Sequence, residues 1–467
     1  MSAPVIWIVL PLIAGIVLWF LRQNRILSVG LAVFLTAALA LLAAFFPIGE
    51  PVRLGGLRLE LTESLVLLGR RFVLSNNERS FLTLIYGAGA AWFIGAFGIW
   101  VHRFFVPFAL AVLAALVAAF SVEPFLFAAL LVEVAVLFSI PLLAPPGEPV
   151  KTGVQRYLIF QTLGMPFVLF AGWVFGSGDA AQINAELLIR AALMLGLGFA
   201  LWLAIFPFFS WVPQLVNETH PFAAAFVLSF VPVSILMLGL DFVSGFGWLR
   251  SSQQLFDVLR IAGILMITTG GIWAASQDQL PRLLGFAVIF ETGFALLAIG
   301  LNTLPGLMLF AAGLLPRFLA LFVLALALGI LKNHRQAMNF DQMKGVFQRY
   351  PFTSIALLTA IFSMSGIPLL AGFPVRLELL EQVARQSVVE TGWALAGNLG
   401  FLIGGLRVLL HVVRASDAPF VRSESLIQRI ILLLGSLFLL LFGLLPGVFY
   451  QSVIFVLRIA PALLTPR

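Results

Sequence analysis

The chain has 467 residues, of which 61% are hydrophobic and only 10% are charged, with a net charge of +7. Water-soluble domains carry about a quarter charged residues, so this composition excludes a soluble globular protein and an intrinsically disordered one. The apolar stretches are continuous rather than alternating, which favours helices over a β-barrel. The sequence therefore predicts an all-α polytopic membrane protein that is embedded in the lipid bilayer.

Several kinds of chemistry are excluded by what the chain lacks. It has no cysteine, which excludes disulfides, iron–sulfur clusters and thiolate metal sites. The four histidines, His102, His220, His334 and His411, are far apart in sequence. There is no glycine-rich phosphate loop of the P-loop type. We therefore expect no cofactor and no metal, and the positive charge of the loops does not imply nucleic acid.

About fourteen apolar runs are long enough to be membrane helices, since about 20 residues cross a bilayer. The first run is expected to stay as a span, because no small-residue cleavage site follows it. A polar excursion over residues 49–79 interrupts the series and predicts a surface hairpin or an interfacial segment. The fourteen predicted spans are residues 4–21, 27–47, 80–100, 103–121, 124–144, 154–176, 188–213, 221–245, 256–275, 283–301, 305–332, 352–372, 390–414 and 428–448.

The short loops predict the orientation, because lysine and arginine concentrate on the cytoplasmic side. With the N-terminus outside, the basic residues fall into alternate loops, and the opposite loops are poor in them apart from the 49–79 excursion. Both termini are therefore expected outside. The cytoplasmic set comprises Arg22, Arg25, Arg103, Lys151, Arg156, Lys332, Arg335, Lys344, Arg349, Arg414, Arg422 and Arg429.

Helix breakers fall inside the seventh, eleventh and twelfth predicted spans, at Pro207, Pro316 and Pro368. Breaks at membrane depth are tolerated where the freed backbone is buried or lines a wet cavity, although a simple proline kink is an alternative at each position. The seventh and twelfth helices lie five apart, which predicts two inverted five-helix repeats, helices 4–8 and 9–13. The expected divisions are residues 1–102, 103–250, 251–416 and 417–467.

Ionisable side chains within spans are costly and are therefore candidates for function. Glu133 and Glu291 lie in the middle of predicted helices, and Arg317 follows Pro316. Arg376 and Glu378 follow Pro368. We expect Arg317 and Arg376 to be ion-paired or solvated inside the bundle rather than facing lipid, with Glu291 or Glu378 as the partner. Asp241, Arg282 and His220 lie nearer to helix ends and are possible edges of an ion path, or interfacial anchors.

At these residues the chain resembles the antiporter-like membrane subunits of respiratory complex I, Mrp cation/proton antiporters and energy-converting hydrogenases. The resemblance rests on Glu133 in the fifth helix and on three segments in the expected order. These are FPFFSWVP at 206–213, SQDQLPRLLGF at 276–286 and GFPVR at 372–376. It implies a helical fold with inverted repeats, an ion path through the centre, and partner membrane subunits that include related antiporter-like chains.

The departures from the family pattern concern the groups that carry protons. The family lysine of the seventh helix falls on Trp202, and the following histidine falls on Phe209. Arg317 and Arg376 take the places of lysines in the eleventh and twelfth helices, and Glu291 takes a place that is often histidine. Arginine does not release its proton in proteins, so these positions can hold charge but cannot relay protons.

The sequence predicts a membrane subunit of a complex I-like or hydrogenase-like assembly, with no redox centre of its own and a proton path that is intact in places and missing in others. Two alternatives remain open: a subunit of a non-redox cation/proton antiporter or inorganic-carbon uptake complex, and a non-conducting scaffold. The bacterial cytoplasmic membrane is the expected location.

Overall fold

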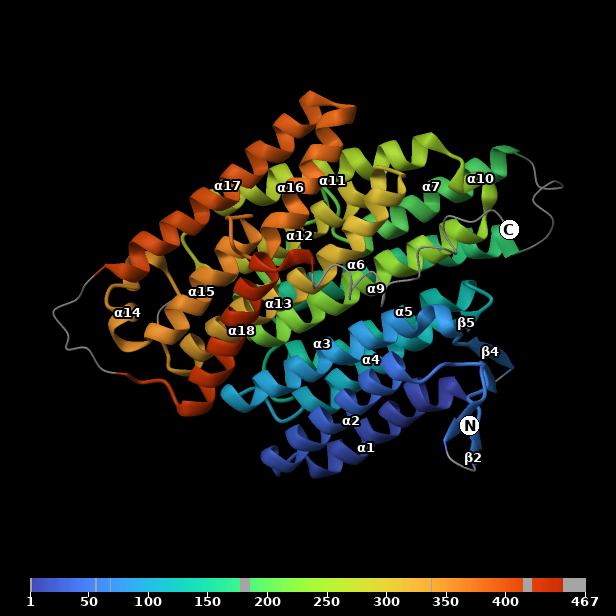
Figure 1. Cartoon of the computed structure of the whole chain (residues 1–467), viewed down its shortest axis with the longest axis horizontal. Helices are drawn as coiled ribbons and strands as arrows, with labels where there is room; N and C mark the ends of the chain where they lie inside the picture. Colours follow the sequence, from blue (N-terminus) through green and yellow to red (C-terminus); the bar gives the residue numbers. More distant parts are fainter. Residues whose placement is uncertain are drawn as a thin grey trace.

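The computed structural model describes residues 2–54, 57–67, 69–176, 185–336, 338–414 and 422–447. Most of them lie in helices, and many of these helices run roughly along one another (Figure 1). Ten of the described helices are long and apolar enough to cross a membrane. The chain is therefore an integral membrane protein with a predominantly α-helical fold, as its composition predicts.

The first third of the chain forms one side of the bundle, where α1 packs on α4 and α2 packs on α3 (Figure 1). A short π-helix, Val5–Val9, leads directly into α1. The helices are α1 Leu10–Leu21, α2 Arg25–Phe45, α3 Arg79–Gly98 and α4 Phe105–Ser121.

The 49–79 excursion forms short antiparallel strands, so the fold is not purely helical. One pair joins β1 to β2, and β4 lies between β3 and β5 in a second small sheet. A 3-10 turn over Asn76–Glu78 then leads into α3. The strands are β1 Val52–Leu54, β2 Leu57–Leu59, β3 Ser64–Leu67, β4 Arg70–Val73 and β5 Val122–Glu123.

The remaining helices complete the bundle. The middle set is α5 Leu126–Leu143, α6 Thr152–Gly176, α7 Ala185–Trp202, α8 Trp211–Glu218, α9 Pro221–Gly245 and α10 Gly247–Arg250. The last set is α11 Gln253–Ala275, α12 Leu280–Gly300, α13 Leu304–Asn333, α14 Val346–Arg349, α15 Pro351–Met364, α16 Gly372–Gln386, α17 Val388–Val413 and α18 Leu426–Leu444, with a 3-10 turn at Phe340–Gln342.

Three helices, α9, α12 and α13, form the buried centre of the bundle, whereas fewer than half of the residues of α2, α17 and α18 are buried. Glycines bring neighbouring backbones together around this centre. A Cβ atom at Gly271 of α11 would overlap the carbonyl oxygen of Gly397 of α17, and one at Gly263 would meet the backbone nitrogen of Leu297 of α12 at 2.6 Å. Small residues permit this close approach, which lets dispersion forces hold the helices together within lipid.

Helix interruptions occur at two of the three predicted prolines. The segment that contains Pro207 separates α7 from α8, and the segment that contains Pro368 separates α15 from α16. Residues with positive φ accompany both interruptions: Ala204 in the first, and Gly366 and Leu369 in the second. Left-handed backbone cannot continue a right-handed helix, so these residues end the helices together with the prolines.

The break expected at Pro316 is wrong, because α13 continues through this residue without interruption. The proline removes only the hydrogen bond to the carbonyl of Ala312, and no residue of positive φ lies nearby. The adjacent residues, Leu315 and Arg317, are good helix formers, and tertiary contacts bury much of this helix. A single lost backbone bond is therefore tolerated inside the bundle.

Candidate functional site

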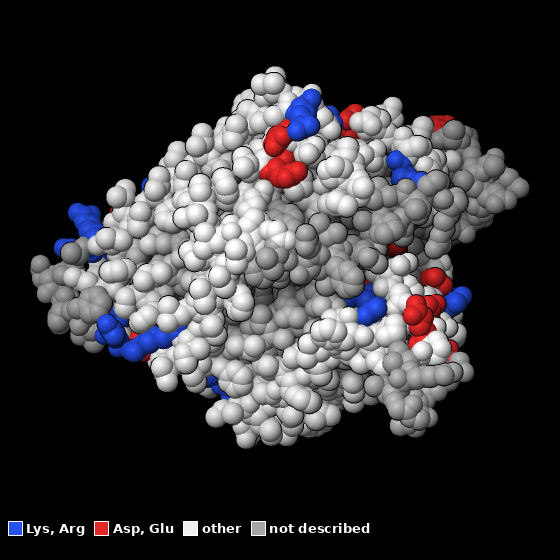
Figure 2. All heavy atoms as spheres, viewed as in Figure 1, with Lys and Arg blue, Asp and Glu red and all other residues white. Residues whose placement is uncertain are grey.

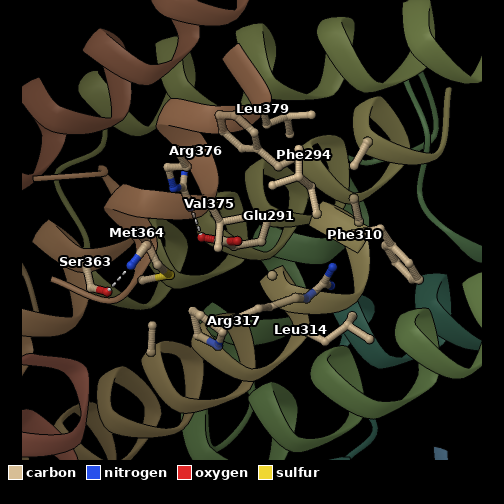
Figure 3. A pocket seen from close by; sticks show the side chains of 17 residues that line it. Glu291, Phe294, Phe310, Leu314, Arg317, Ser363, Met364, Val375, Arg376 and Leu379 are labelled. Atoms are coloured by element: carbon tan, nitrogen blue, oxygen red, sulfur yellow. Dashed lines mark hydrogen bonds and ion pairs between the residues drawn. The ribbon is translucent and has the colours of Figure 1, made fainter. Parts of the chain in front are cut away.

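An ion pair lies in the buried centre of the bundle, between α12 and α16 (Figure 3). Nη2 of Arg376 donates a hydrogen bond to Oε1 of Glu291. The arginine side chain is 8% exposed and the glutamate side chain 9%. The expectation that Arg376 lies inside the bundle and pairs with a carboxylate is therefore confirmed in the geometry, with Glu291 as its partner.

The interruption between α15 and α16 makes room for this arginine. A Cβ atom at Gly366 would lie 2.9 Å from Cδ of Arg376, and one at Gly372 would overlap the carbonyl oxygen of Ser363. The guanidinium also lies over two rings, with Cζ 4.9 Å from the centroid of Phe290 and 4.4 Å from that of Phe294. Cation–π attraction therefore adds to the ion pair in this apolar environment.

A second arginine, Arg317 of α13, is buried close by, and its residue is 3% exposed. Its Nη2 donates to Oγ1 of Thr292 at 3.0 Å, and that hydroxyl donates in turn to the backbone carbonyl of Val288. Among the described residues, no hydrogen-bond partner reaches its Nε or Nη1, and the same holds for Nε and Nη1 of Arg376.

Glu291, Arg317 and Arg376 line one cavity of about 50 Å³ (Figure 3). A cavity of this size has room for water-sized species, which need roughly 10–15 Å³ each when volume is measured this way. The remaining walls are largely apolar, and include Phe294, Phe310 and Leu379. The interruption, the ion pair and the cavity thus occur together at the centre of the second half of the chain.

The other residues singled out in this half lie at the surface. Glu378 is exposed on α16 and does not line the cavity, so it is not the partner of Arg376. Arg282 is exposed in the first turn of α12, and Asp241 is exposed near the end of α9. These three positions fit interfacial anchors better than members of a buried path.

Glu133 occupies a different setting in the first half. It is half-buried on α5, and its Oε1 accepts a hydrogen bond of 2.6 Å from Oγ1 of Thr162 on α6. Its Oε2 is buried and has no hydrogen-bond partner within the described part of the chain. Trp202, at the place of the family lysine, exchanges two hydrogen bonds with the backbone carbonyl and side chain of Gln161. The indole thus binds α6, and an indole cannot supply the positive charge that the family lysine would carry.

Lysines reach the end of α8, a role that the sequence does not reveal. Nζ of Lys151 donates to the carbonyl of Glu218 and Nζ of Lys332 to that of Thr219, each at 2.6 Å. Lys332 belongs to the last turn of α13, so its expected placement in a loop is wrong. The C-terminal end of a helix attracts cations, but the sequence does not show which lysine reaches this end.

These lysines line a cavity of about 280 Å³ at one end of the bundle, together with His102 and His220. His220 immediately precedes α9, and its Nε2 lies 3.4 Å from Oδ1 of Asn333. Burial, reinforced by the charge of Lys332, lowers the pKa of His220 to about 4, although the contact with Asn333 acts in the opposite direction.

A neighbouring cavity of about 430 Å³ is lined by Arg22, Arg25 and Arg103 and shares His102 with the first. Five of the basic residues assigned to the cytoplasmic side therefore gather at one end of the molecule. On the face drawn in Figure 2, charged side chains lie toward the left, right and upper edges, and the surface between them is almost uncharged. A hydrocarbon layer requires such a surface.

Curated relatives match part of the chain. It is 26% identical over 317 residues to NADH-quinone oxidoreductase subunit N of Acidithiobacillus ferrooxidans, which is 62% of this chain and 64% of the relative. It is 31% identical over 210 residues to the subunit of the same name from Francisella tularensis, covering 44% and 42%. The chain thus spans less than two thirds of the length of either relative.

Solved structures match almost the whole chain. A chain of the membrane-bound sulfane sulfur reductase, an archaeal respiratory membrane complex, has a TM-score of 0.81 at 16% identity. A chain of the Mrp complex from Dietzia sp. has a TM-score of 0.82 at 16% identity. In both, 99% of each chain is covered. A chain of respiratory complex I from Thermus thermophilus has a TM-score of 0.71 at 20% identity, covering 98% of this chain and 99% of that chain. At these identities the likeness concerns the fold.

The family described as "NADH:quinone oxidoreductase/Mrp antiporter, TM" matches residues 156–403, which is more than half of the chain. This range contains both helix interruptions and the Glu291–Arg376 ion pair. The sequence resemblance is thereby confirmed: the chain belongs to the family of antiporter-like transmembrane subunits shared by NADH:quinone oxidoreductase and Mrp antiporters.

Proposed function

We propose that this chain is a membrane subunit of a complex I-like or hydrogenase-like assembly, in which redox chemistry in partner subunits drives proton movement. The names of the curated relatives support the proposal, and so does the shared fold. Other membrane subunits, including related antiporter-like chains, are its proposed partners. The bacterial cytoplasmic membrane is its proposed location, in keeping with the bacterial relatives.

The observation that carries the proposal is the buried Glu291–Arg376 pair beside an interrupted helix and a cavity. Glu291 is the only acidic residue among the described residues that line the cavity. The two arginines keep their protons, so a proton that crosses this region has to use Glu291 and water. In this proposal the arginines supply fixed charge, Glu291 exchanges the proton, and Glu133 is a secondary site in the first half.

A scaffold role is the second candidate, and the surroundings of Trp202 favour it. The indole binds α6 where the resemblance expects a titratable lysine, so this position of the first half cannot relay a proton. A chain that has lost conduction in this half can still hold its place between other membrane subunits. The two candidates differ in whether neutralising Glu291 changes ion movement.

We infer the finer architecture from the same elements. Thirteen apolar helices, counting three short ones, together with α7–α8 would make fourteen spans. The two interruptions support inverted repeats over residues 103–250 and 251–416, with residues 1–102 and 417–467 flanking them. The basic end of the bundle would face the cytoplasm, which places both termini outside.

Charge-neutral substitutions in the assembled complex test the proposed function. Glu291→Gln is expected to lower the number of protons moved per redox turnover while assembly is retained, and Glu133→Gln is expected to lower it less. Glu378→Gln is the matched control, since this residue is exposed on α16. Proton movement would be measured in vesicles against electron transfer. An unchanged ratio in Glu291→Gln contradicts proton transfer through this site and favours the scaffold.

A further inference from the structure

The charges around the central cavity do not balance. Among the residues that line it, two are basic, Arg317 and Arg376, and one is acidic, Glu291. The carboxylate is bound to Arg376, whereas the hydrogen-bond partner of Arg317 is the neutral hydroxyl of Thr292. With all three groups charged, the described lining of the cavity carries an excess of one positive charge, and Arg317 is the arginine that does not contact the carboxylate directly.

The surroundings make this excess costly. Arg317 is 3% exposed, and nearby cavity walls include Phe310, Leu314 and Leu309. Charges in such apolar surroundings interact strongly and are rarely left without a counter-charge. Water can satisfy the free N–H groups, but it cannot neutralise a guanidinium. Arginine also does not shed its proton to become neutral.

The free donors of Arg317 suit an anion. Nε and Nη1 are buried and have no hydrogen-bond partner among the described residues, and a guanidinium presents such N–H groups in a fixed planar fork. The cavity of about 50 Å³ accepts species the size of one or a few water molecules, which excludes large organic anions. We propose that the cavity between α12, α13 and α16 binds a small monovalent inorganic anion of about the size of chloride at Arg317.

This site is independent of proton translocation, because it requires only the buried arginines and the cavity. A bound anion would neutralise the charge of Arg317, so Glu291 can remain paired with Arg376. It would also occupy part of the volume beside Glu291. Chloride binding tests the anion site, whereas the number of protons moved per redox turnover tests the proposed proton exchange. Either proposal can therefore fail without the other.

Equilibrium binding of radiolabelled chloride tests the proposal. The full chain would be purified with its partner subunits in chloride-free gluconate buffer, and chloride would be added at constant ionic strength without redox turnover. We expect saturable binding of one chloride per chain at this site, measured as the difference from Arg317→Gln. Arg282→Gln is the matched control, because Arg282 is exposed in the first turn of α12, outside the cavity. It should bind chloride as the unaltered chain does.

Two further variants keep the test decisive if Arg317→Gln does not fold. Arg317→Lys keeps the charge but loses the fork, so chloride affinity should fall at least tenfold without vanishing. Gly313→Val keeps both arginines and fills part of the cavity, since a Cβ atom there makes only an ordinary 3.6 Å contact with Val375. It should also weaken binding. Equal binding by the unaltered chain and the Arg317 variants, or an equal loss in Arg282→Gln, would overturn the proposal.

Discussion

The buried ion pair dominates the energetics at the scale of single residues. Removing one partner of such a pair leaves an uncompensated charge, which typically costs about 3–5 kcal/mol. Glu291→Gln leaves both arginines of the cavity without a carboxylate and should therefore lower the free energy of unfolding by an amount of this order, and adding Arg376→Gln should restore part of it. Denaturant unfolding in detergent measures both. Arg385→Gln, exposed on the same helix as Arg376, should change little, and a double variant no more stable than the single would refute the pairing.

His220 gives the molecule a pH dependence that can be checked. Its folded-state pKa of about 4 lies below the ordinary value of 6.5, so the unfolded chain binds the proton more readily. This group therefore costs no stability above about pH 6.5, and stability falls as the pH drops from there toward 4. His220→Gln should reduce the fall in melting temperature as the pH drops from about 6.5 toward 4. A profile as steep as that of the unaltered chain would assign the effect to other groups.

At the residue scale, the sequence predicts the surroundings of a side chain where the free-energy cost of exposing its charge to lipid leaves few alternatives. An arginine in an apolar span must be buried in protein or paired, which was enough to predict the surroundings of Arg376. The sequence does not show that Thr292 is the partner of Arg317, or that Gln161 binds Trp202. These contacts join different helices, and their side chains are too common in sequence to signal a partner.

At the scale of elements, the break between α15 and α16 depends on glycine as much as on proline. Gly372 lies so close to the carbonyl of Ser363 that a Cβ atom cannot be added without movement. Gly372→Ala should therefore destabilise the fold by about 1–3 kcal/mol and shift Arg376. Gly392→Ala, in α17 with open space around it, is the matched control and should be neutral or stabilising. Melting temperatures measure the difference, and equal values would contradict the close packing.

Proline positions alone do not predict an interruption, as the three predicted breaks demonstrate. Pro207 and Pro368 lie in segments where Ala204, Gly366 and Leu369 adopt positive φ, and the helix ends there. Pro316 lies among strong helix formers, and α13 continues. Prolines can be read from the sequence, whereas the positive φ angles of Ala204 and Leu369 depend on tertiary packing. The position of these two breaks was therefore predictable, and the continuity of α13 was not.

At the scale of the whole molecule, the N-terminus and the basic cavities lie at opposite ends of the first helices. Residues Ser2 and Thr62 form a bridge beside the strands, and the chain then runs through α1 to the cavity lined by Arg22 and Arg25. Composition predicts that the chain is a membrane protein, and the loop charges predict that the N-terminus and these arginines lie on opposite sides. They do not predict the strand pairing of residues 49–79, where alternating apolar residues fitted both a hairpin and an interfacial segment.

The absence of cysteine makes the proposed orientation directly testable. Asn77, exposed beside the strands, and Gln23, exposed between α1 and α2, lie at opposite ends of the bundle. If lysine and arginine mark the cytoplasmic side, a membrane-impermeant maleimide added to intact cells should label Asn77→Cys. Gln23→Cys should react only after the membrane is permeabilised, and the unaltered chain should not react at all. Labelling of Gln23→Cys in intact cells, with Asn77→Cys protected, would invert the topology and place the lysines that bind the end of α8 outside.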